Sequence, residues 1–147
     1  LDRVQTLIAS GVQEGAELIA GAGSTPDQGY FVRPTVFANR SCAALTLLRE
    51  EVFGPVLVMQ PYDELEQALA EANNSSYGLG ASVWTKDLSL ALRTAERLQA
   101  GTVWINAHNV VDPNMPFGGF KQSGIGREHG RAAIDAYTES KTICIAY

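Results

Sequence analysis

The chain has 147 residues, of which 46% are hydrophobic and 18% are charged, and its formal net charge is −5. This length and composition are those of one globular domain with a core of its own. The acidic balance argues against nucleic acid as a partner, because a phosphate-binding surface gathers Lys and Arg, whereas the 11 basic residues here are scattered. No apolar run has the length that a membrane span needs, so we expect no membrane partner.

The first predicted element is a helix over residues 2–21, with Asp2 and Gln5 as a capping pair. A loop over residues 21–29 follows it. Residues 30–39 then favour a strand that is either short or at an edge, because Pro34 cannot donate a hydrogen bond to a ladder.

The middle of the chain alternates regularly between strand and helix patterns. Residues 56–62, 80–85 and 101–107 are typical of strands, and an apolar helical stripe lies in each interval between them. Asp63 and Asp87 stand where the two helices would be capped. This alternation predicts an α/β fold with a parallel βαβαβ sheet, right-handed crossovers and flanking helices.

Residues 116–130, PFGGFKQSGIGREHG, contain five glycines. The tail of this segment nearly spells the dinucleotide fingerprint G-x-G-x-x-G, but His129 stands in place of the third glycine. Ligands of open α/β sheets lie beyond the carboxyl ends of the strands, so this segment and the end of the third strand belong to the functional edge. The segment is a phosphate loop, a structural corner or a site wall. His108, just after the strand, is a candidate site residue, and His129 is expected on a helix surface.

Glu50 and Glu51 precede a Phe-Gly-Pro corner. Two carboxylates beside such a corner indicate either a pair for general acid–base catalysis or a solvated helix end. Adjacent residues project in different directions, so we do not expect the two to share one role.

The remaining polar residues do not complete a catalytic set. Cys42 and Cys144 lie far apart and, together with the two histidines, lack the spacing of a metal site. Ser123 lacks the flanking glycines of a nucleophile elbow. We therefore expect no metal and no disulfide framework, and the reducing cytoplasm is the expected location.

Several segments in register resemble the closing segments of the NAD(P)-dependent aldehyde dehydrogenases. These are YFVRPTVF, EEVFGPV, ANNSSYGLGASVWTKD, GTVWIN, PFGGFKQSGIGREHG and YTESKTICIAY. The resemblance covers essentially the whole chain and implies a parent enzyme that oxidises an aldehyde to a carboxylic acid. Family members use a cysteine nucleophile to form a thiohemiacetal, pass hydride to the cofactor and hydrolyse the thioester with help from a glutamate base.

The resemblance also implies what this chain lacks. The nucleophile and the Rossmann half would lie upstream of Leu1, and neither Cys42 nor Cys144 matches the position of the nucleophile. The absence of an initiating Met and the helical pattern at the start agree with a fragment. We therefore expect no catalytic residue in the chain and no activity from the chain alone.

The resemblance implies the following site residues. Glu51 would accept hydrogen bonds from the hydroxyls of the nicotinamide ribose of NAD or NADP, and Phe53 would pack near the nicotinamide ring. Phe117 would line the aldehyde tunnel. The loop after the third strand would shape the mouth of the tunnel, with His108 and Val111 as candidate substrate contacts.

The same resemblance implies partners and boundaries. The loop that would shape the mouth of the tunnel, residues 107–115, is called the mouth loop. Its apolar composition is similar to that of phenylacetaldehyde-type members, which favours a medium or aromatic aldehyde. Residues 1–137 would form the carboxyl-terminal part of the catalytic domain. Residues 138–147 would form an oligomerisation strand in a homodimer or homotetramer. The alternatives are a non-catalytic assembly module, a degenerate relative, and a reductive relative acting on an acyl phosphate; the EEVFGP corner favours the oxidising group.

Overall fold

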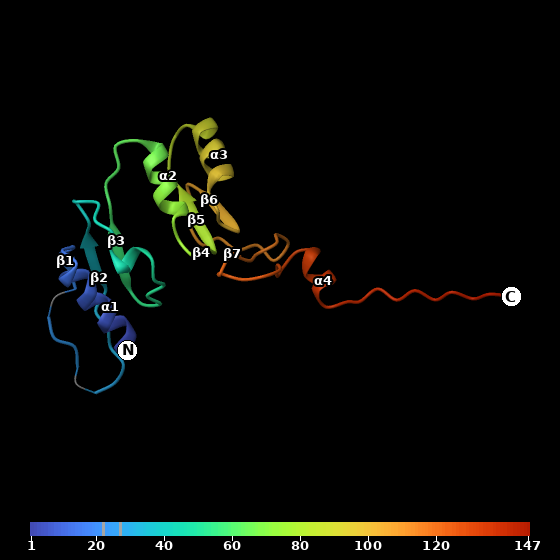
Figure 1. The fold of residues 1–147 in the computed structure, drawn as a ribbon, viewed down its shortest axis with the longest axis horizontal. Helices are drawn as coiled ribbons and strands as arrows, with labels where there is room; N and C mark the ends of the chain where they lie inside the picture. The colour runs from blue at the N-terminus through green and yellow to red at the C-terminus, as the bar shows by residue number, and fades with distance from the viewer. Residues whose placement is uncertain (22, 27) are drawn as a thin grey trace. The chain divides into compact units, whose positions relative to one another are not determined.

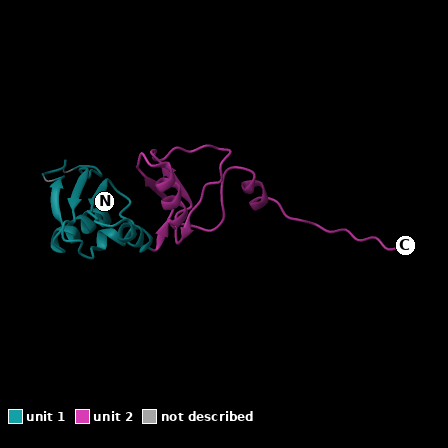
Figure 2. Cartoon of the chain, turned by 90° about the horizontal axis from the view of Figure 1, so that it is seen from above, with its two compact units in different colours: residues 1–75 teal, residues 76–147 magenta. Residues whose placement is uncertain are grey.

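The computed structural model of the chain describes residues 1–21, 23–26 and 28–147. These residues divide into two compact units, Leu1–Ser75 and Ser76–Tyr147 (Figure 2). The loop predicted over residues 21–29 includes Ala22 and Asp27, which lie outside the described residues. No helix in the described chain combines the length and apolarity that crossing a bilayer requires.

The first unit packs helices beside a mixed sheet (Figure 1). In the sheet, the central strand β2 pairs antiparallel with β1 and parallel with β3. The elements in chain order are α1 (Asp2–Gln13), β1 (Glu17–Ala20), β2 (Thr35–Ala38), the 3-10 helix η1 (Thr46–Leu48), β3 (Val56–Met59) and α2 (Leu65–Asn73).

The first helix is shorter than the sequence predicts. α1 ends two residues before Gly15, which takes a φ of +91°, a left-handed conformation that glycine adopts readily. Residues 17–20 were predicted as helix and instead form β1, because they pair with β2. The predicted capping by Asp2 and Gln5 is wrong, since the helix begins at Asp2 and Leu1 stands at the N-cap without a side-chain bond.

The core of the first unit forms where β2 faces α1 and η1. Phe37 of β2 is fully buried in it, and burying a Phe side chain contributes roughly 1.5–3 kcal/mol. Gly11 permits this close packing, because a Cβ there would overlap the side chain of Leu47. The buried apolar cluster comprises Leu7, Ala16, Phe37, Leu45 and Leu47.

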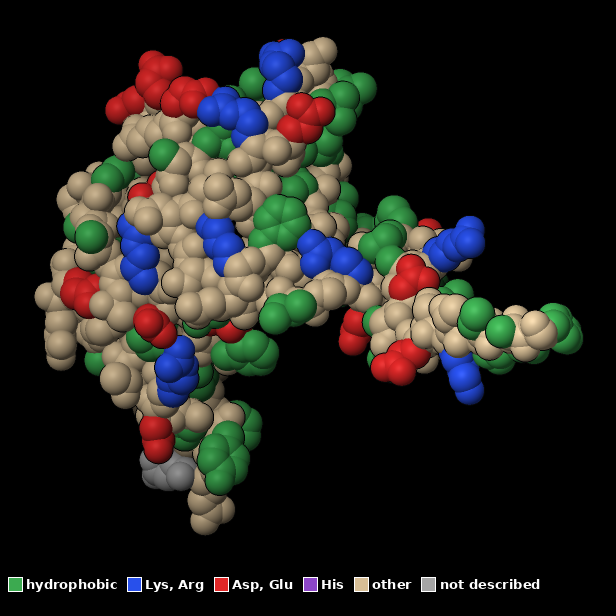
Figure 3. Space-filling model, turned by 45° about the vertical axis from the view of Figure 1, so that its right-hand side comes forward, with side chains coloured by type: hydrophobic (Ala, Val, Ile, Leu, Met, Phe, Trp, Pro, Cys, Tyr) green, Lys and Arg blue, Asp and Glu red, His purple; other side chains and the backbone are tan. Residues whose placement is uncertain are grey.

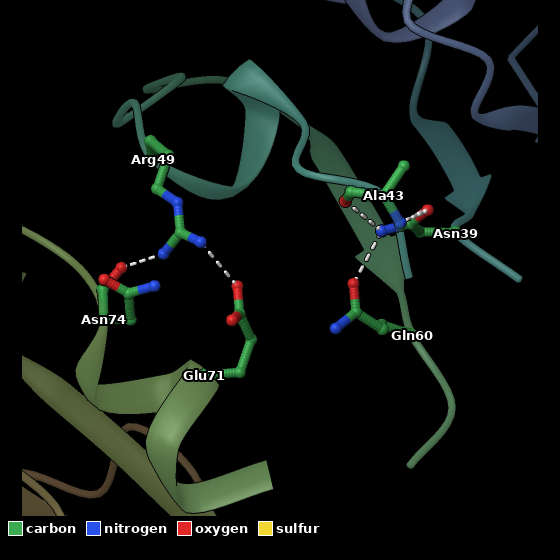
Figure 4. A network of polar contacts seen from close by, with 6 residues as sticks. All are labelled: Asn39, Ala43, Arg49, Gln60, Glu71 and Asn74. Atoms are coloured by element: carbon green, nitrogen blue, oxygen red, sulfur yellow. Dashed lines mark hydrogen bonds and ion pairs between the residues drawn. The ribbon is translucent and has the colours of Figure 1, made fainter. Parts of the chain in front are cut away.

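A buried amide fixes the turn after β2. The Asn39 side chain donates to the carbonyl of Ala43 at 2.8 Å and to Oε1 of Gln60 at 2.6 Å, and its own oxygen accepts from the Ala43 amide at 3.1 Å (Figure 4). A buried polar group with all these partners is well satisfied. The bonds tie the end of β2 to the residue after β3.

The second unit contains a strand–helix–strand unit and a glycine-rich segment. Asp87 caps α3 as predicted, because its Oδ1 accepts from the Leu90 amide at 2.9 Å. The corresponding prediction for Asp63 is wrong, since Glu64 stands at the N-cap of α2 without a side-chain bond. The elements are β4 (Tyr77–Gly78), β5 (Gly80–Val83), α3 (Leu88–Arg97), β6 (Thr102–Ile105), β7 (Phe120–Lys121) and α4 (Ala132–Ala136).

The predicted parallel βαβαβ sheet forms only in part. β5 and β6 are parallel with α3 between them, but β3 pairs with β2 rather than with β5. The physical reason lies in the core, because Val56 and Val58 of β3 pack against the cluster around Phe37. β4 and β7 form a separate antiparallel pair. The fold is therefore α/β with mixed sheets.

The C-terminal residues of the described chain form neither helix nor strand. Residues 139–147 run extended from the short helix α4 (Figure 1). The side chains of Ile143, Ile145 and Tyr147 are exposed, and Figure 3 shows hydrophobic side chains along this extended end. A strand is formed by pairing with a neighbour, so the oligomerisation strand over residues 138–147 stays a prediction.

Glu14 stabilises the first unit in its charged form. Its carboxylate accepts hydrogen bonds from the hydroxyl and the amide of Thr46, both at 2.6 Å, and these bonds lower the pKa of Glu14 below its ordinary 4.5. Because the folded pKa is the lower one, the stabilisation is complete above pH 4.5 and is lost as the pH falls through the folded value.

We therefore expect Glu14→Gln to lower the urea midpoint of the chain at about pH 7 and to lower it by less at about pH 3, because protonation of the carboxyl removes part of the difference. The exposed Glu96→Gln is the control. An equal deficit for Glu14→Gln at both pH values would contradict this account.

Candidate functional site

Residues 49–53 form a corner between η1 and β3 that α2 holds on one side. Arg49, which ends η1, donates to Oε1 of Glu71 at 3.0 Å and to the backbone carbonyl of Asn74 (Figure 4). Glu71 belongs to α2 and Asn74 ends that helix. Since both side chains of the ion pair are about two-thirds shielded from solvent, the start of the corner is fixed to α2.

α1 holds the corner at a second place. Arg3 donates to Oε2 of Glu50 at 3.1 Å and to the backbone carbonyl of Glu51 at 3.0 Å. Glu50 is thereby drawn into an ion pair with α1, while the side chain of Glu51 stays exposed. The two adjacent carboxylates have different surroundings, as expected, and do not form an acid–base pair.

The end of the corner directs an aromatic ring outward. Val52 packs against the core, and the next residue, Phe53, takes a φ of +55° and is 86% exposed. A left-handed φ is rare for a bulky residue and persists only where its neighbours are fixed. Gly54 then passes close to α1, because a Cβ there would lie 2.9 Å from both Cγ atoms of Val4. The side chains of Glu51 and Phe53 are therefore both exposed at this corner.

The glycine-rich segment of the second unit is a structural corner. Its two ends meet at Phe117 and Glu128, whose amides donate to one another's carbonyls at 2.8 and 2.7 Å. Between them, β7 pairs with β4, and the Ser123 hydroxyl accepts from the Gly78 amide at 2.9 Å. Of the three interpretations of this segment, its hydrogen bonds support the corner.

The structure does not support the phosphate-loop interpretation of the same segment. The fingerprint requires a strand, a glycine turn and a helix in succession. Here the two-residue β7 is antiparallel, and α4 begins only at Ala132 and has five residues. Phe117 instead borders a hollow of about 490 Å³ whose apolar lining includes Leu79, Ile125 and Tyr137. Ser123, Arg127 and Glu128 also line this hollow, so its wall is of mixed polarity.

His129 differs from its predicted place on a helix surface. It precedes α4, takes a φ of +60°, and its ring centroid lies 6.2 Å from that of Phe117. Its Nδ1 is buried without a hydrogen-bond partner among the described residues. The sequence could not show this contact, because it depends on the pairing of Phe117 with Glu128 across the segment.

The loop after β6 carries the other two predicted site residues. His108 places Nδ1 at 2.7 Å from Oγ of Ser82, and its ring meets Trp104 edge-on at a centroid distance of 5.4 Å. Trp104 donates from Nε1 to the carbonyl of Val110 at 2.8 Å, and the Val111 side chain is exposed. Sequence reasoning missed Ser82 and Trp104, although strand alternation could have placed them near the strand end.

The predicted residues therefore fall into two groups. Glu51 and Phe53 share the corner of the first unit, while His108 and Val111 share one loop of the second unit and Phe117 a neighbouring wall. Both cysteines are free and exposed, in the described chain. The described residues contain no group of three or more His, Cys, Asp or Glu side chains that could hold a metal ion.

Comparison with known proteins identifies the family. The sequence profile of the aldehyde dehydrogenase family matches residues 1–143. The chain belongs to the aldehyde dehydrogenase family. It is 57% identical over 141 residues to phenylacetaldehyde dehydrogenase of Pseudomonas fluorescens, a match that covers 95% of this chain and 28% of that protein.

Solved aldehyde dehydrogenases have the same fold over this stretch. The NAD+ complex of the Bacillus cereus enzyme superposes with a TM-score of 0.85 at 48% identity, covering 94% of this chain and 28% of that one. Aldehyde dehydrogenase C of Pseudomonas syringae, a C291A mutant in complex with NAD+ and octanal, superposes with a TM-score of 0.87 at 43% identity, covering 95% and 29%. The chain thus spans under a third of the length of these relatives.

Close backbone packing in this aldehyde dehydrogenase segment makes Gly101 sensitive to substitution. Gly101 donates to the carbonyl of Gly78 at 3.0 Å, and a Cβ on it would overlap the carbonyl of Gly118. We expect Gly101→Ala to displace the wall that carries Phe117 and to lower the free energy of unfolding by about 1–3 kcal/mol. Urea unfolding of the chain measures this effect, and an unchanged midpoint would show that the wall is not packed as described.

Proposed function

We propose that the chain supplies the cofactor corner and the substrate wall of an NAD(P)-dependent aldehyde dehydrogenase, which oxidises an aldehyde to a carboxylic acid. The observation that carries the proposal is the corner at residues 49–53, held by Arg3 and Arg49, in which the Glu51 carboxylate and the Phe53 ring, two positions apart, are both exposed. Membership of the family and the NAD+ complexes of its relatives support it.

The residues of the corner fit a nicotinamide dinucleotide. Glu51 is not engaged by Arg3 through its side chain, so its two carboxylate oxygens can accept hydrogen bonds from neighbouring ribose hydroxyls. The exposed Phe53 offers an aromatic face and edge for packing beside a planar ring. When bound there, the cofactor would supply the hydride acceptor for the oxidation.

Phe117, His108 and Val111 are proposed to line the path of the aldehyde. The hollow beside Phe117 has apolar side chains in its lining, among them Leu79, Ile125 and Tyr137, and Val111 is an exposed apolar side chain of the loop after β6. A pocket of this composition suits a medium or aromatic aldehyde. Phenylacetaldehyde and octanal, named with two relatives, are of this kind.

Residues 138–147 are proposed to form a strand with a partner subunit in a homodimer or homotetramer, beyond a catalytic part over residues 1–137. The exposed side chains of Ile143, Ile145 and Tyr147 alternate along the chain, which suits one face of a strand. Pairing would also remove an aggregation hazard. The two free cysteines support a reducing cytoplasm as the location.

In the first test, this chain replaces the matching segment of Pseudomonas fluorescens phenylacetaldehyde dehydrogenase. We call the product the chimaera. The chimaera is expected to oxidise phenylacetaldehyde with NAD+. In it, Glu51→Gln should raise KM for NAD+ and lower turnover, together costing about tenfold in kcat/KM, because a charged acceptor is replaced by a neutral one.

Glu50→Gln is the matched control, since the Glu50 carboxylate is bound to Arg3 instead. Its kinetic constants should stay within about twofold of those of the chimaera, as for an exposed ion pair. An inactive chimaera, or equal effects of the two substitutions, would refute the proposed role of the corner.

A second test concerns the nucleophile, which we propose comes from outside this chain. Cys42 bonds weakly to the carbonyl of Pro61 at 3.6 Å, and Cys144 lies in the exposed C-terminal end. The chimaera with both Cys42→Ser and Cys144→Ser should keep full turnover, and the 147-residue chain alone should oxidise no aldehyde. Loss of activity in the double variant, or activity from the chain alone, would overturn this assignment.

A further inference from the structure

Ser82 and Trp104 form a polar and aromatic cluster on the parallel strands β5 and β6. The two residues are register partners in the ladder, so their side chains lie on the same face of the strand pair. His108, which follows β6, contacts both of them, through Nδ1 to the Ser82 hydroxyl at 2.7 Å and through its ring to the indole. The cluster therefore connects the strands to the loop at residues 106–115.

The indole of Trp104 is seated tightly between strand and loop. A Cβ on Gly80 of β5 would lie 2.8 Å from Cζ3 of the indole, so the ring occupies the space that this glycine leaves open. On its other side, Nε1 donates to the carbonyl of Val110 at 2.8 Å. The Trp104 ring thus fixes the position of Val110, in the middle of the loop, relative to β5 and β6.

Other hydrogen bonds of the described residues fix this loop at its start and over residues 112–115. At its start, the Asn106 side chain exchanges two hydrogen bonds with the backbone of Thr85, at 2.9 and 2.8 Å. Near its end, the Gly130 amide donates to the carbonyl of Pro113 at 2.9 Å, and the Met115 amide donates to that of Asp112 at 3.0 Å. Between these ends, the bonds of His108 and Trp104 place the exposed Val110 and Val111 side chains.

We propose that Trp104 and His108 are positioning residues that set which aldehydes the enzyme prefers, by fixing where Val110 and Val111 stand. This inference rests on the proposed function, in which the loop shapes the mouth of the substrate path. Besides lining the aldehyde path, His108 acts here by holding the loop to Ser82. Fixed apolar side chains favour the ligand whose shape they match, whereas a loosened loop discriminates less.

The kinetic test uses the chimaera and compares Trp104→Phe with Trp84→Phe. The first keeps an aromatic ring but loses the donor to Val110; the second is the same substitution at an indole that is 68% exposed in the same unit. Trp104→Phe should lower the ratio of kcat/KM for phenylacetaldehyde over acetaldehyde by about three- to tenfold, the effect of roughly one net hydrogen bond. KM for NAD+ should not change, and Trp84→Phe should leave the ratio unchanged.

Ser82→Ala is the milder second variant, should Trp104→Phe fail to fold. It removes the partner of His108 and should lower the same ratio while keeping kcat for acetaldehyde. Equal loss of kcat on every aldehyde would instead assign Ser82 and His108 a catalytic role, since their separation also suits a hydroxyl nucleophile and its base. That result would overturn the positioning role, and so would an unchanged ratio in both variants.

Hydrogen exchange of the 147-residue chain separates this inference from the proposed function. Trp104→Phe should speed exchange of the Met115 amide by about three- to tenfold, because the loop loses one hydrogen bond to the strands. Trp84→Phe should not. Unchanged exchange in Trp104→Phe would overturn the anchoring even if the chimaera is active. If exchange in the 147-residue chain is faster but the chimaera is inactive, the proposed function and the specificity role are refuted. The anchoring of the loop by Trp104 would then still stand.

Discussion

The candidate site depends on irregular backbone that regular elements hold in place. Phe53, Asn106 and His129 all take left-handed φ values, between +53° and +60°, which cost about 1–3 kcal/mol each for residues other than glycine. Hydrogen bonds fix the chain at or beside each of them: Arg3 of α1 binds the Glu51 carbonyl, Thr85 bonds to the Asn106 side chain, and Glu128 pairs with Phe117 next to His129. Without these anchors the same residues would relax, and the exposed side chains would no longer have defined directions.

Each unit carries its own group of proposed site residues, and the two groups differ in chemistry. In the first unit, Arg3 binds the Glu50 carboxylate and the Glu51 carbonyl, and Arg49 ties the corner to α2, which leaves the Glu51 carboxylate exposed. In the second unit, the Trp104 indole binds the loop that carries Val110, and the glycine-rich corner separately borders a hollow beside Phe117. A charged corner suits the hydroxyls of a cofactor, and apolar side chains suit an aldehyde. The division agrees with a segment that binds both ligands of an oxidation and carries no nucleophile of its own.

Sequence reasoning found the elements whose signals are local. The cap at Asp87 and the unit β5–α3–β6 follow from a short polar signal and regular apolar spacing, and both are confirmed. It failed where contacts between residues far apart in sequence decide the structure. β1 was predicted as helix because Leu18 and Ile19 continue the apolar stripe of α1, but it pairs with β2. β3 was predicted to join the sheet of β5 and β6, but it also pairs with β2. The placement of His129 against Phe117 and of Trp104 under the mouth loop also needed the fold. The family resemblance, in contrast, rests on whole segments in order and is confirmed over residues 1–143.

A crystal structure of the chimaera with NAD+ and an unreactive aldehyde analogue tests most directly whether corner and wall serve one reaction. The account predicts that the Glu51 carboxylate lies about 3 Å from the hydroxyls of the nicotinamide ribose, as a hydrogen bond requires, with the analogue against the Phe117 ring. A cofactor whose ribose is bound by other residues while Glu51 faces solvent would contradict it.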